Sequence, residues 1–396
     1  DEKYYFLSTS DNNTSEQYYF SVNENIPKPK LIKKRKKGIL YSVNSWNGYF
    51  YKHTNENAED FKIKVCKDLS NQNWKTYIAP KEEVLIGDLI FLNDWIIRSE
   101  TSDALGKIFA KNVKTGFEEE IKFADEKVIV PGVSLIQRNR NTDLLYLGYS
   151  SPKTQSRTYL YNLKTKEKKL VKEQEIPSGH NSEDYIVERL ECKSHDGRIV
   201  PITITRHKKT KVNGSANLLL YGYGSYGSSI SPSFSSTRLS LINRDIIWVT
   251  AHIRGGMERG MKWWKEGKLL NKKNTFEDYI AVAKFLIEKK YTSNKKIIGM
   301  GGSILGTKSI YSFLKKKIQK KVFFFDNLDS NLNLKYKKIK NLKNSCFIVA
   351  GKSGRTIETI INLGTIFSKN LLKNKLIIIT EITDNALMTI ANKYHA

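Results

Sequence analysis

Cysteine is rare in this sequence, and its rarity excludes two classes of protein. Cys66, Cys192 and Cys346 are few, odd in number and far apart. Such spacing encodes neither a disulfide framework nor a zinc site, so no metal is expected. A reducing compartment suits the chain best, and we therefore expect it to be cytoplasmic.

Long apolar runs are also missing. The longest, such as residues 322–325 and 376–379, are far too short to cross a bilayer, and no basic-then-apolar leader opens the chain. We therefore expect no membrane partner. The first residue is Asp1 rather than methionine, which leads us to expect that further residues precede it.

Charge of one sign dominates, with a formal net charge of +27. A basic run, KKRKK at residues 33–37, would be the best support for nucleic-acid binding. Lysines are nevertheless spread along the whole chain, without a basic helix or an aromatic platform. We interpret most of them as solvated surface residues and expect no specific nucleic-acid partner, only weak attraction to polyanions at low salt.

Short strands separated by polar turns fill the sequence up to about residue 175. They are rich in Tyr, Val and Ile, and almost nothing before residue 175 has a helical period. Aromatic strands followed by polar hairpins recur about every 45 residues, which suits four-stranded propeller blades. About four blades would fit, fewer than most closed propellers need. A β-sandwich is the alternative, and further blades are expected upstream.

The composition changes near Pro177 and Gly179, which indicates a linker. Beyond it, buried strands end in glycine loops, and residues 275–291 have the spacing of an amphipathic helix. This alternation predicts a doubly wound α/β domain. We expect a partial β-propeller over residues 1–176 and an incomplete α/β domain over residues 183–396. Residues 380–396 carry no readable motif, so a docked helix and a disordered terminus both stay open.

A candidate nucleophile elbow lies where an apolar run ends in glycines. Gly301, Gly302 and Ser303 fit the pattern G-x-S-x-G, although Leu305 occupies the position of the last glycine. Such a turn places a serine hydroxyl at the carboxyl end of a strand. The alternative is an ordinary loop between a strand and a helix.

Several ordered motifs together are more specific than the elbow. They are LLLYGYGSYG, PSFSSTRLSLINR, AHIRGGMERG, GKLLNKKNTFEDYIAVAKFLIEKKYTS and GGSILG. In this order they resemble the prolyl oligopeptidase family, in its oligopeptidase B (protease II) branch, from about residue 35 to 306. The resemblance implies a propeller joined to an α/β-hydrolase domain, and cleavage of short peptides after Lys or Arg. It implies no cofactor.

Residue roles follow from the resemblance. Ser303 matches the nucleophile, and the Tyr223 hydroxyl matches the side-chain donor of the oxyanion hole, with the backbone N–H of Ile304 as its partner. Asp329, in an Asp-Ser pair, is preferred over Asp326 as the triad acid. The alternative for Tyr223 is a buried aromatic anchor of its loop.

The triad base is absent from its expected place. VAGKSGR aligns with the His-Gly-Gly-Lys-Ser-Gly-Arg stretch of the family, so Val349 stands where the histidine belongs. Valine cannot accept a proton. None of the six histidines occupies that position; they are His53, His180, His195, His207, His252 and His395.

The specificity pocket is reduced as well. Only 25 residues separate Ser303 from Asp329, whereas the family inserts several elements there that carry much of its acidic pocket. An acidic pair typical of the branch would fall at Ser231 and Ser233. Glu258 is kept and is our candidate substrate-binding residue; a solvated loop carboxylate is the alternative.

We therefore expect a serine-type oligopeptidase by ancestry, acting on short basic peptides through an acyl-enzyme at Ser303 and inactive in this copy. Two alternatives stay open: a non-catalytic propeller that binds peptides or proteins, and a general α/β-hydrolase esterase. The oligomeric state is not encoded in any pattern that we can identify.

Overall fold

The computed structural model describes residues 3–11, 13–123, 126–137, 140–301, 347–350, 360, 363–364, 376–379 and 385–394. The chain divides into two compact units, residues 1–298 and 299–396, and each is considered by itself. None of the helices in these described ranges is long and apolar enough to span a membrane.

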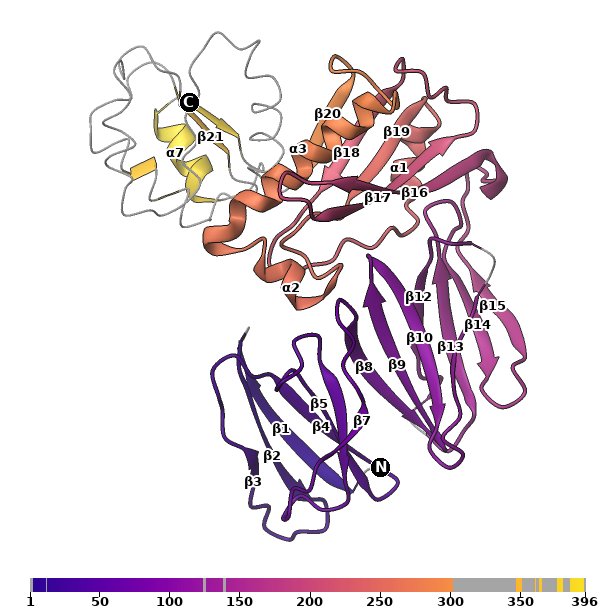
Figure 1. Ribbon diagram of the computed structural model, residues 1–396, viewed down its shortest axis with the longest axis vertical. Helices are drawn as coiled ribbons and strands as arrows, with labels where there is room; N and C mark the ends of the chain where they lie inside the picture. Colours follow the sequence, from indigo (N-terminus) through magenta and orange to yellow (C-terminus); the bar gives the residue numbers. More distant parts are fainter. Residues whose placement is uncertain are drawn as a thin grey trace. The chain divides into compact units, whose positions relative to one another are not determined.

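Antiparallel sheets form the first part of the chain (Figure 1). The first has three strands in the order β1-β2-β3, and the next three have four each, in the orders β4-β5-β6-β7, β11-β10-β9-β8 and β12-β13-β14-β15. The strands are Tyr4–Ser10 (β1), Ser15–Ser21 (β2), Lys30–Lys33 (β3), Tyr41–Trp46 (β4), Tyr49–Thr54 (β5), Lys62–Cys66 (β6), Lys75–Ile78 (β7), Leu85–Leu92 (β8), Trp95–Ser102 (β9), Leu105–Asn112 (β10), Glu118–Glu120 (β11), Val130–Ser134 (β12), Leu144–Ser150 (β13), Arg157–Asn162 (β14) and Lys168–Glu173 (β15). The predicted succession of short strands is confirmed.

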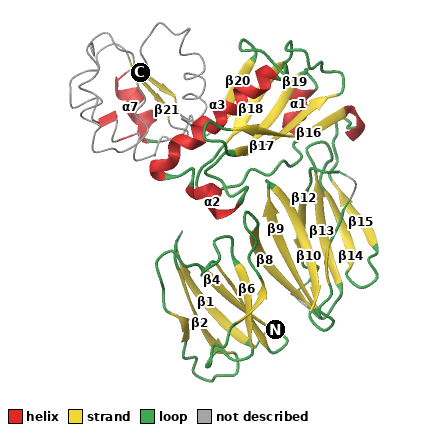
Figure 2. Ribbon diagram, viewed as in Figure 1, coloured by secondary structure: helices red, strands yellow, loops and turns green. Residues whose placement is uncertain are grey.

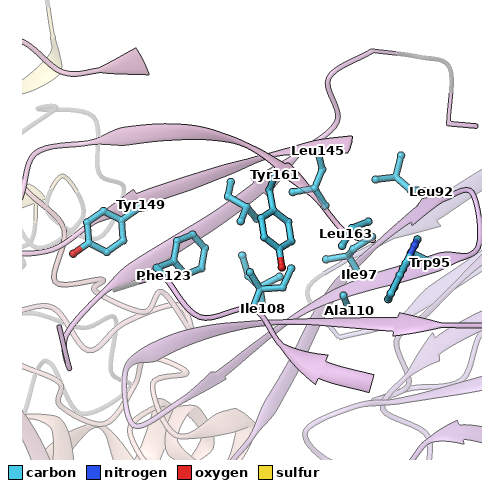
Figure 3. Close-up of a cluster of buried hydrophobic side chains, with 12 residues drawn as sticks. Leu92, Trp95, Ile97, Ile108, Ala110, Phe123, Leu145, Tyr149, Tyr161 and Leu163 are labelled. Carbon is cyan, nitrogen blue, oxygen red and sulfur yellow. The ribbon is translucent and has the colours of Figure 1, made fainter. Parts of the chain in front are cut away.

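Side-chain alternation explains how these sheets stack. In β13, Leu145, Leu147 and Tyr149 are buried, whereas the residues between them are partly exposed. These side chains pack against Ile97 and Ile108 of the preceding sheet, in the cluster that Figure 3 shows. A second cluster joins that sheet to β4–β7, and a third joins β4–β7 to β1–β3. Each sheet therefore shares a core with the next, as blades do.

Tight hairpins join neighbouring strands within a sheet. Asn47 and Gly48 connect β4 to β5 with φ values of 49° and 75°. Positive φ at both central residues defines a type I′ turn, whose twist matches that of the strands. Asp103 and Ala104 connect β9 to β10 in the same way, with φ values of 50° and 62°. A buried alanine tolerates this strained conformation because its amide donates to the Glu258 carbonyl of the α/β lobe.

A mixed sheet with flanking helices follows the blades (Figure 2). Its strand order is β16-β17-β19-β18-β20, with β18 and β19 parallel. The elements are η1 (Ser182–Asp184), β16 (Tyr185–Lys193), β17 (Ile199–His207), β18 (Asn217–Gly222), α1 (Ser236–Ile242), β19 (Ile246–Ala251), α2 (Gly260–Lys265), η2 (Leu269–Asn271), α3 (Lys272–Glu288) and β20 (Ile297–Gly301). The predicted amphipathic helix is α3, which buries Tyr279, Val282 and Leu286.

Polar contacts join the α/β lobe to the blades. Asp60, between β5 and β6, accepts a hydrogen bond of 2.6 Å from the Met261 amide at the start of α2. Arg259 pairs with Glu83 at 2.8 Å and with Asp103 at 2.9 Å. Arg259 and Met261 therefore contact two different blades.

Within the second unit, β21 (Phe347–Ala350) and β22 (Leu376–Ile379) are parallel neighbours. Helix α7 (Ala386–Tyr394) packs beside them through Leu387, which is buried with Val349 and Leu363. The terminal segment, which the sequence left open between a helix and a disordered end, contains this helix.

Candidate active site

The predicted site residues divide between described and undescribed parts of the chain. Tyr223 and Glu258 are described, whereas Ser303, Ile304 and Asp329 lie outside the described residues. The strand that leads toward the serine is present as β20, which ends at Gly301. The roles assigned to Ser303, Ile304 and Asp329 stay predictions.

Two neighbouring strands, β18 and β20, precede the Tyr223 loop and the predicted elbow in the sequence. The Leu218 amide, at the start of β18, donates to the carbonyl of Lys296, just before β20. The two strands therefore begin together and run parallel, so that β18 and β20 end at the same edge of the sheet. In parallel α/β sheets, functional loops follow the carboxyl ends of the strands. Because the Tyr223 loop follows β18, it begins at that edge.

Glycine is required in the Tyr223 loop because other chain segments approach its backbone closely. Gly224 has a φ of +59°, and a β-carbon there would lie 2.6 Å from the Arg254 carbonyl oxygen. The Gly227 amide donates to the Gly255 carbonyl at 3.0 Å. The loop is thus fixed against the chain segment that follows β19.

A buried network of ion pairs and hydrogen bonds holds the chain segment that follows β19. Arg254, only 1% exposed, donates to the fully buried carboxylate of Asp278 through its backbone N–H at 3.0 Å, Nε at 2.8 Å and Nη2 at 2.6 Å. Its Nη1 also pairs with Asp196. Burial is the largest single influence on the pKa of Asp196 and would raise it, but the hydrogen bonds from Arg254 and the Arg198 amide, together with the Arg254 charge, lower the pKa overall. Sequence reasoning missed this network, although both RGG and the Asp of TFEDY lie in the quoted motifs.

Glu258 is buried rather than exposed to solvent. Its side chain is 1% exposed, and Oε1 accepts a hydrogen bond of 2.9 Å from the Ile230 amide. Among the described residues, Oε2 has no hydrogen-bond partner. Burial raises the pKa of Glu258 to about 7. Substrate binding by this carboxyl stays a prediction; the carboxyl accepts from the Ile230 amide, and the backbone carbonyl of Glu258 accepts from the Ala104 amide.

The position predicted for one missing acid borders a small cavity. Ser231 lines a cavity of about 170 Å³ together with Ile230, Thr101 and Lys107, between the loop after Tyr223 and the third and fourth sheets. Its one carboxylate, Glu100, is buried and pairs with Arg98 at 2.8 Å. The cavity therefore offers a basic peptide no carboxylate free of an arginine partner.

His252 is placed in the sheet core. It is fully buried, its Nε2 lies 2.9 Å from the Thr203 hydroxyl, and Arg189 donates to that hydroxyl at 2.8 Å. Burial lowers the pKa of His252 well below its usual range, so the ring is neutral. This placement is that of a packing residue.

Other histidines also have structural partners. His53 contacts the Ile86 carbonyl at 2.8 Å and stacks on Phe61, and His180 contacts the Lys153 carbonyl at 2.7 Å. His395 lies outside the described residues.

Val349, at the expected position of the base, belongs to strand β21. Its side chain is 8% exposed and packs with Leu363 and Leu387 in the core of the second unit. An apolar residue suits this environment, whereas a histidine there would need a polar partner. The apolar surroundings of this position suit the valine that the sequence has in place of the family histidine.

Comparison with known sequences supports the resemblance. A sequence model described as "Prolyl oligopeptidase family" matches residues 232–317, and one described as "Prolyl oligopeptidase, N-terminal beta-propeller domain" matches residues 1–174. The chain is 33% identical to Protease 2 of Moraxella lacunata over 306 residues, which are 77% of this chain and 44% of the relative. It is 32% identical to Dipeptidyl aminopeptidase BI of Pseudoxanthomonas mexicana over 280 residues, 70% of this chain and 38% of the relative. The chain therefore spans well under half the length of these curated relatives.

Solved structures show the same fold. Oligopeptidase B from Trypanosoma brucei, with covalently bound antipain, matches 99% of this chain and 64% of its own, with a TM-score of 0.79 and 22% identity. Oligopeptidase B from Leishmania major matches 80% of this chain and 46% of its own, with a TM-score of 0.71 and 24% identity. The predicted combination of a partial propeller with an incomplete α/β-hydrolase domain is confirmed.

Proposed function

Because the chain belongs to the prolyl oligopeptidase family, we propose that it is an oligopeptidase B-like serine peptidase by descent, with Ser303 as nucleophile. Tyr223 and the Ile304 amide would stabilise the oxyanion, and Asp329 would be the triad acid. Substrates would be short peptides with Lys or Arg before the cleaved bond. The observation that carries the proposal is the family match over residues 232–317, which contains the Tyr-Gly loop's partner segment and the serine together.

We also propose that this copy does not turn over peptides. In the family reaction a histidine takes the proton from serine and returns it to the leaving amine. The aligned position holds Val349, which is buried among aliphatic side chains. Loss of the base lowers kcat by roughly 10³-fold or more. Ancestry would thus be enzymatic, and the present chain a cytoplasmic pseudoenzyme.

A fluorophosphonate probe tests the site assignment without requiring turnover. The probe phosphonylates serine nucleophiles, so intact mass and peptide mapping would report a slow, single modification at Ser303. The Ser303→Ala variant should stay unmodified. Modification that persists in this variant would contradict the assignment.

A non-catalytic binding role is the second candidate. It is favoured because the chain lacks a histidine at the position of the base, whereas its packing is intact. Each pair of neighbouring sheets keeps a buried core. A fluorescent peptide library bound by both the parent chain and Ser303→Ala, without cleavage, would support this role. Failure of every peptide to bind would oppose it.

A further inference from the structure

Lys272 is an unusual first residue for helix α3. The amino end of a helix carries a partial positive charge and favours acidic side chains. The first turn of α3 contains none, and two lysines, Lys272 and Lys273, stand there instead. Lys273 is exposed, whereas Lys272 is partly buried. A cation kept in this unfavourable place calls for a compensating contact.

The contacts of Lys272 reach the backbone beside Tyr223. Its Nζ donates to the carbonyl oxygen of Gly224 and to the Ser225 hydroxyl, the latter at 2.8 Å. Gly224 is buried. A buried carbonyl without a partner is costly, and the ammonium supplies that partner.

The same carbonyl also lies close to the backbone of Gly255. A β-carbon on Gly255 would lie only 2.0 Å from the Gly224 oxygen, so the carbonyl fits into the space left by the missing side chain. Gly255 has a φ of +103°, which favours glycine. The Gly224 oxygen thus packs against Gly255 and accepts a hydrogen bond from the Lys272 ammonium, and rotation of the Gly224–Ser225 peptide would break these contacts.

We propose that Lys272 is a positioning residue that sets the direction of the Tyr223 hydroxyl. The inference rests on the proposed function, in which this hydroxyl stabilises the oxyanion. The direction of a side chain follows the backbone that carries it, and Lys272 holds the Gly224–Ser225 peptide, which is separated from Tyr223 by a single peptide unit. An oxyanion donor acts only within hydrogen-bond distance of the developing charge, so a small rotation removes its contribution.

Three variants distinguish the effect of the Lys272 ammonium from that of its apolar stem and of the neighbouring lysine. Lys272→Met keeps the apolar stem and removes the donor, Lys272→Arg keeps a charged donor, and Lys273→Met is the matched control on the neighbouring exposed lysine. Phosphonylation of Ser303 is followed over time to separate kinact from KI. We expect Lys272→Met to lower kinact about tenfold or more with KI unchanged. Lys272→Arg should recover most of this loss, and Lys273→Met should match the parent chain. An unchanged kinact in Lys272→Met overturns the proposal.

Hydrogen exchange gives a second readout that does not depend on Ser303. In Lys272→Met, amides of residues 222–227 should exchange faster, while those in the middle of α3 stay as protected as in the parent. Equal exchange in the loop overturns the proposal. If the parent chain is labelled at a residue other than Ser303, the proposed function fails; if it is not labelled at all, as loss of the base allows, exchange alone judges the role of Lys272. Faster exchange confined to the loop supports that role, and unchanged exchange contradicts it.

Discussion

Buried charges in the α/β lobe carry more of its stability than the many surface lysines. Arg254 and Asp278 are 1% and 0% exposed, and they satisfy each other through several hydrogen bonds. Exposed pairs are weak because water screens them and long side chains lose freedom in forming them. The large positive charge of the chain therefore says little about which ions hold the fold together.

Arg254→Met should lower the free energy of unfolding by about 3–5 kcal/mol, because it leaves the Asp278 carboxylate buried without its partner. Urea unfolding followed by tryptophan fluorescence measures the change. Lys265→Met is the control, since Lys265 and Glu59 form an exposed pair and its loss should cost about 1 kcal/mol or less. Equal effects of the two substitutions would refute this ranking.

Glu258 predicts a pH dependence of stability. Burial raises its pKa in the folded chain to about 7, above the ordinary value of 4.5. The folded state therefore binds the proton more tightly than the unfolded state. The stabilisation is complete below about pH 4.5 and is lost as the pH rises through about 7, amounting to roughly 3 kcal/mol.

Comparison of the parent chain with Glu258→Gln isolates this contribution. The amide cannot ionise, so the variant should lose less stability than the parent between pH 5 and pH 8 in urea unfolding. The same loss in both chains would show that Glu258 does not titrate in this window.

The strands differ in how well the sequence predicts them. Strands with regular alternation, such as β13, follow from the pattern, because alternate residues must face a core. Strand β12 contains Pro131 and Gly132, which disfavour strands by propensity, and its pairing with β13 fixes it instead. Lys272 and Arg254 could not be predicted in their roles, because their partners lie 24 to 58 residues away in the sequence. Pattern and spacing describe neighbours in sequence, whereas these contacts depend on tertiary packing.

Strand β1 is expected to promote self-association. Within the described residues it pairs only with β2, so its other edge is open. No charge, proline or glycine interrupts Tyr4–Ser10, and Tyr5 and Leu7 are 60% and 53% exposed. Such edges pair readily with other chains.

Leu7→Lys should reduce concentration-dependent association, measured by light scattering, because lysine on an edge strand opposes further pairing. Leu170→Lys provides the comparison. It lies on β15, an edge strand that already carries Lys168, Lys169 and Lys172, so a further lysine should change little. Association that is insensitive to Leu7→Lys would place the contact elsewhere.

At the scale of the whole molecule, the described residues keep the fold of the family, whereas we propose that its chemistry has been lost. The sheets share cores, and Asp60 and Arg259 join the blades to the α/β lobe. The resemblance indicated the fold and the nucleophile position from ordered motifs. It also indicated the loss of the base, and Val349 lies in a packed strand.

We propose that this chain keeps a serine peptidase architecture but has lost turnover. Hydrolysis of a chromogenic dipeptide ending in Arg or Lys, compared between the parent chain and Ser303→Ala, tests it most directly. We predict the same background rate for both chains. Turnover by the parent chain that Ser303→Ala abolishes would contradict the account.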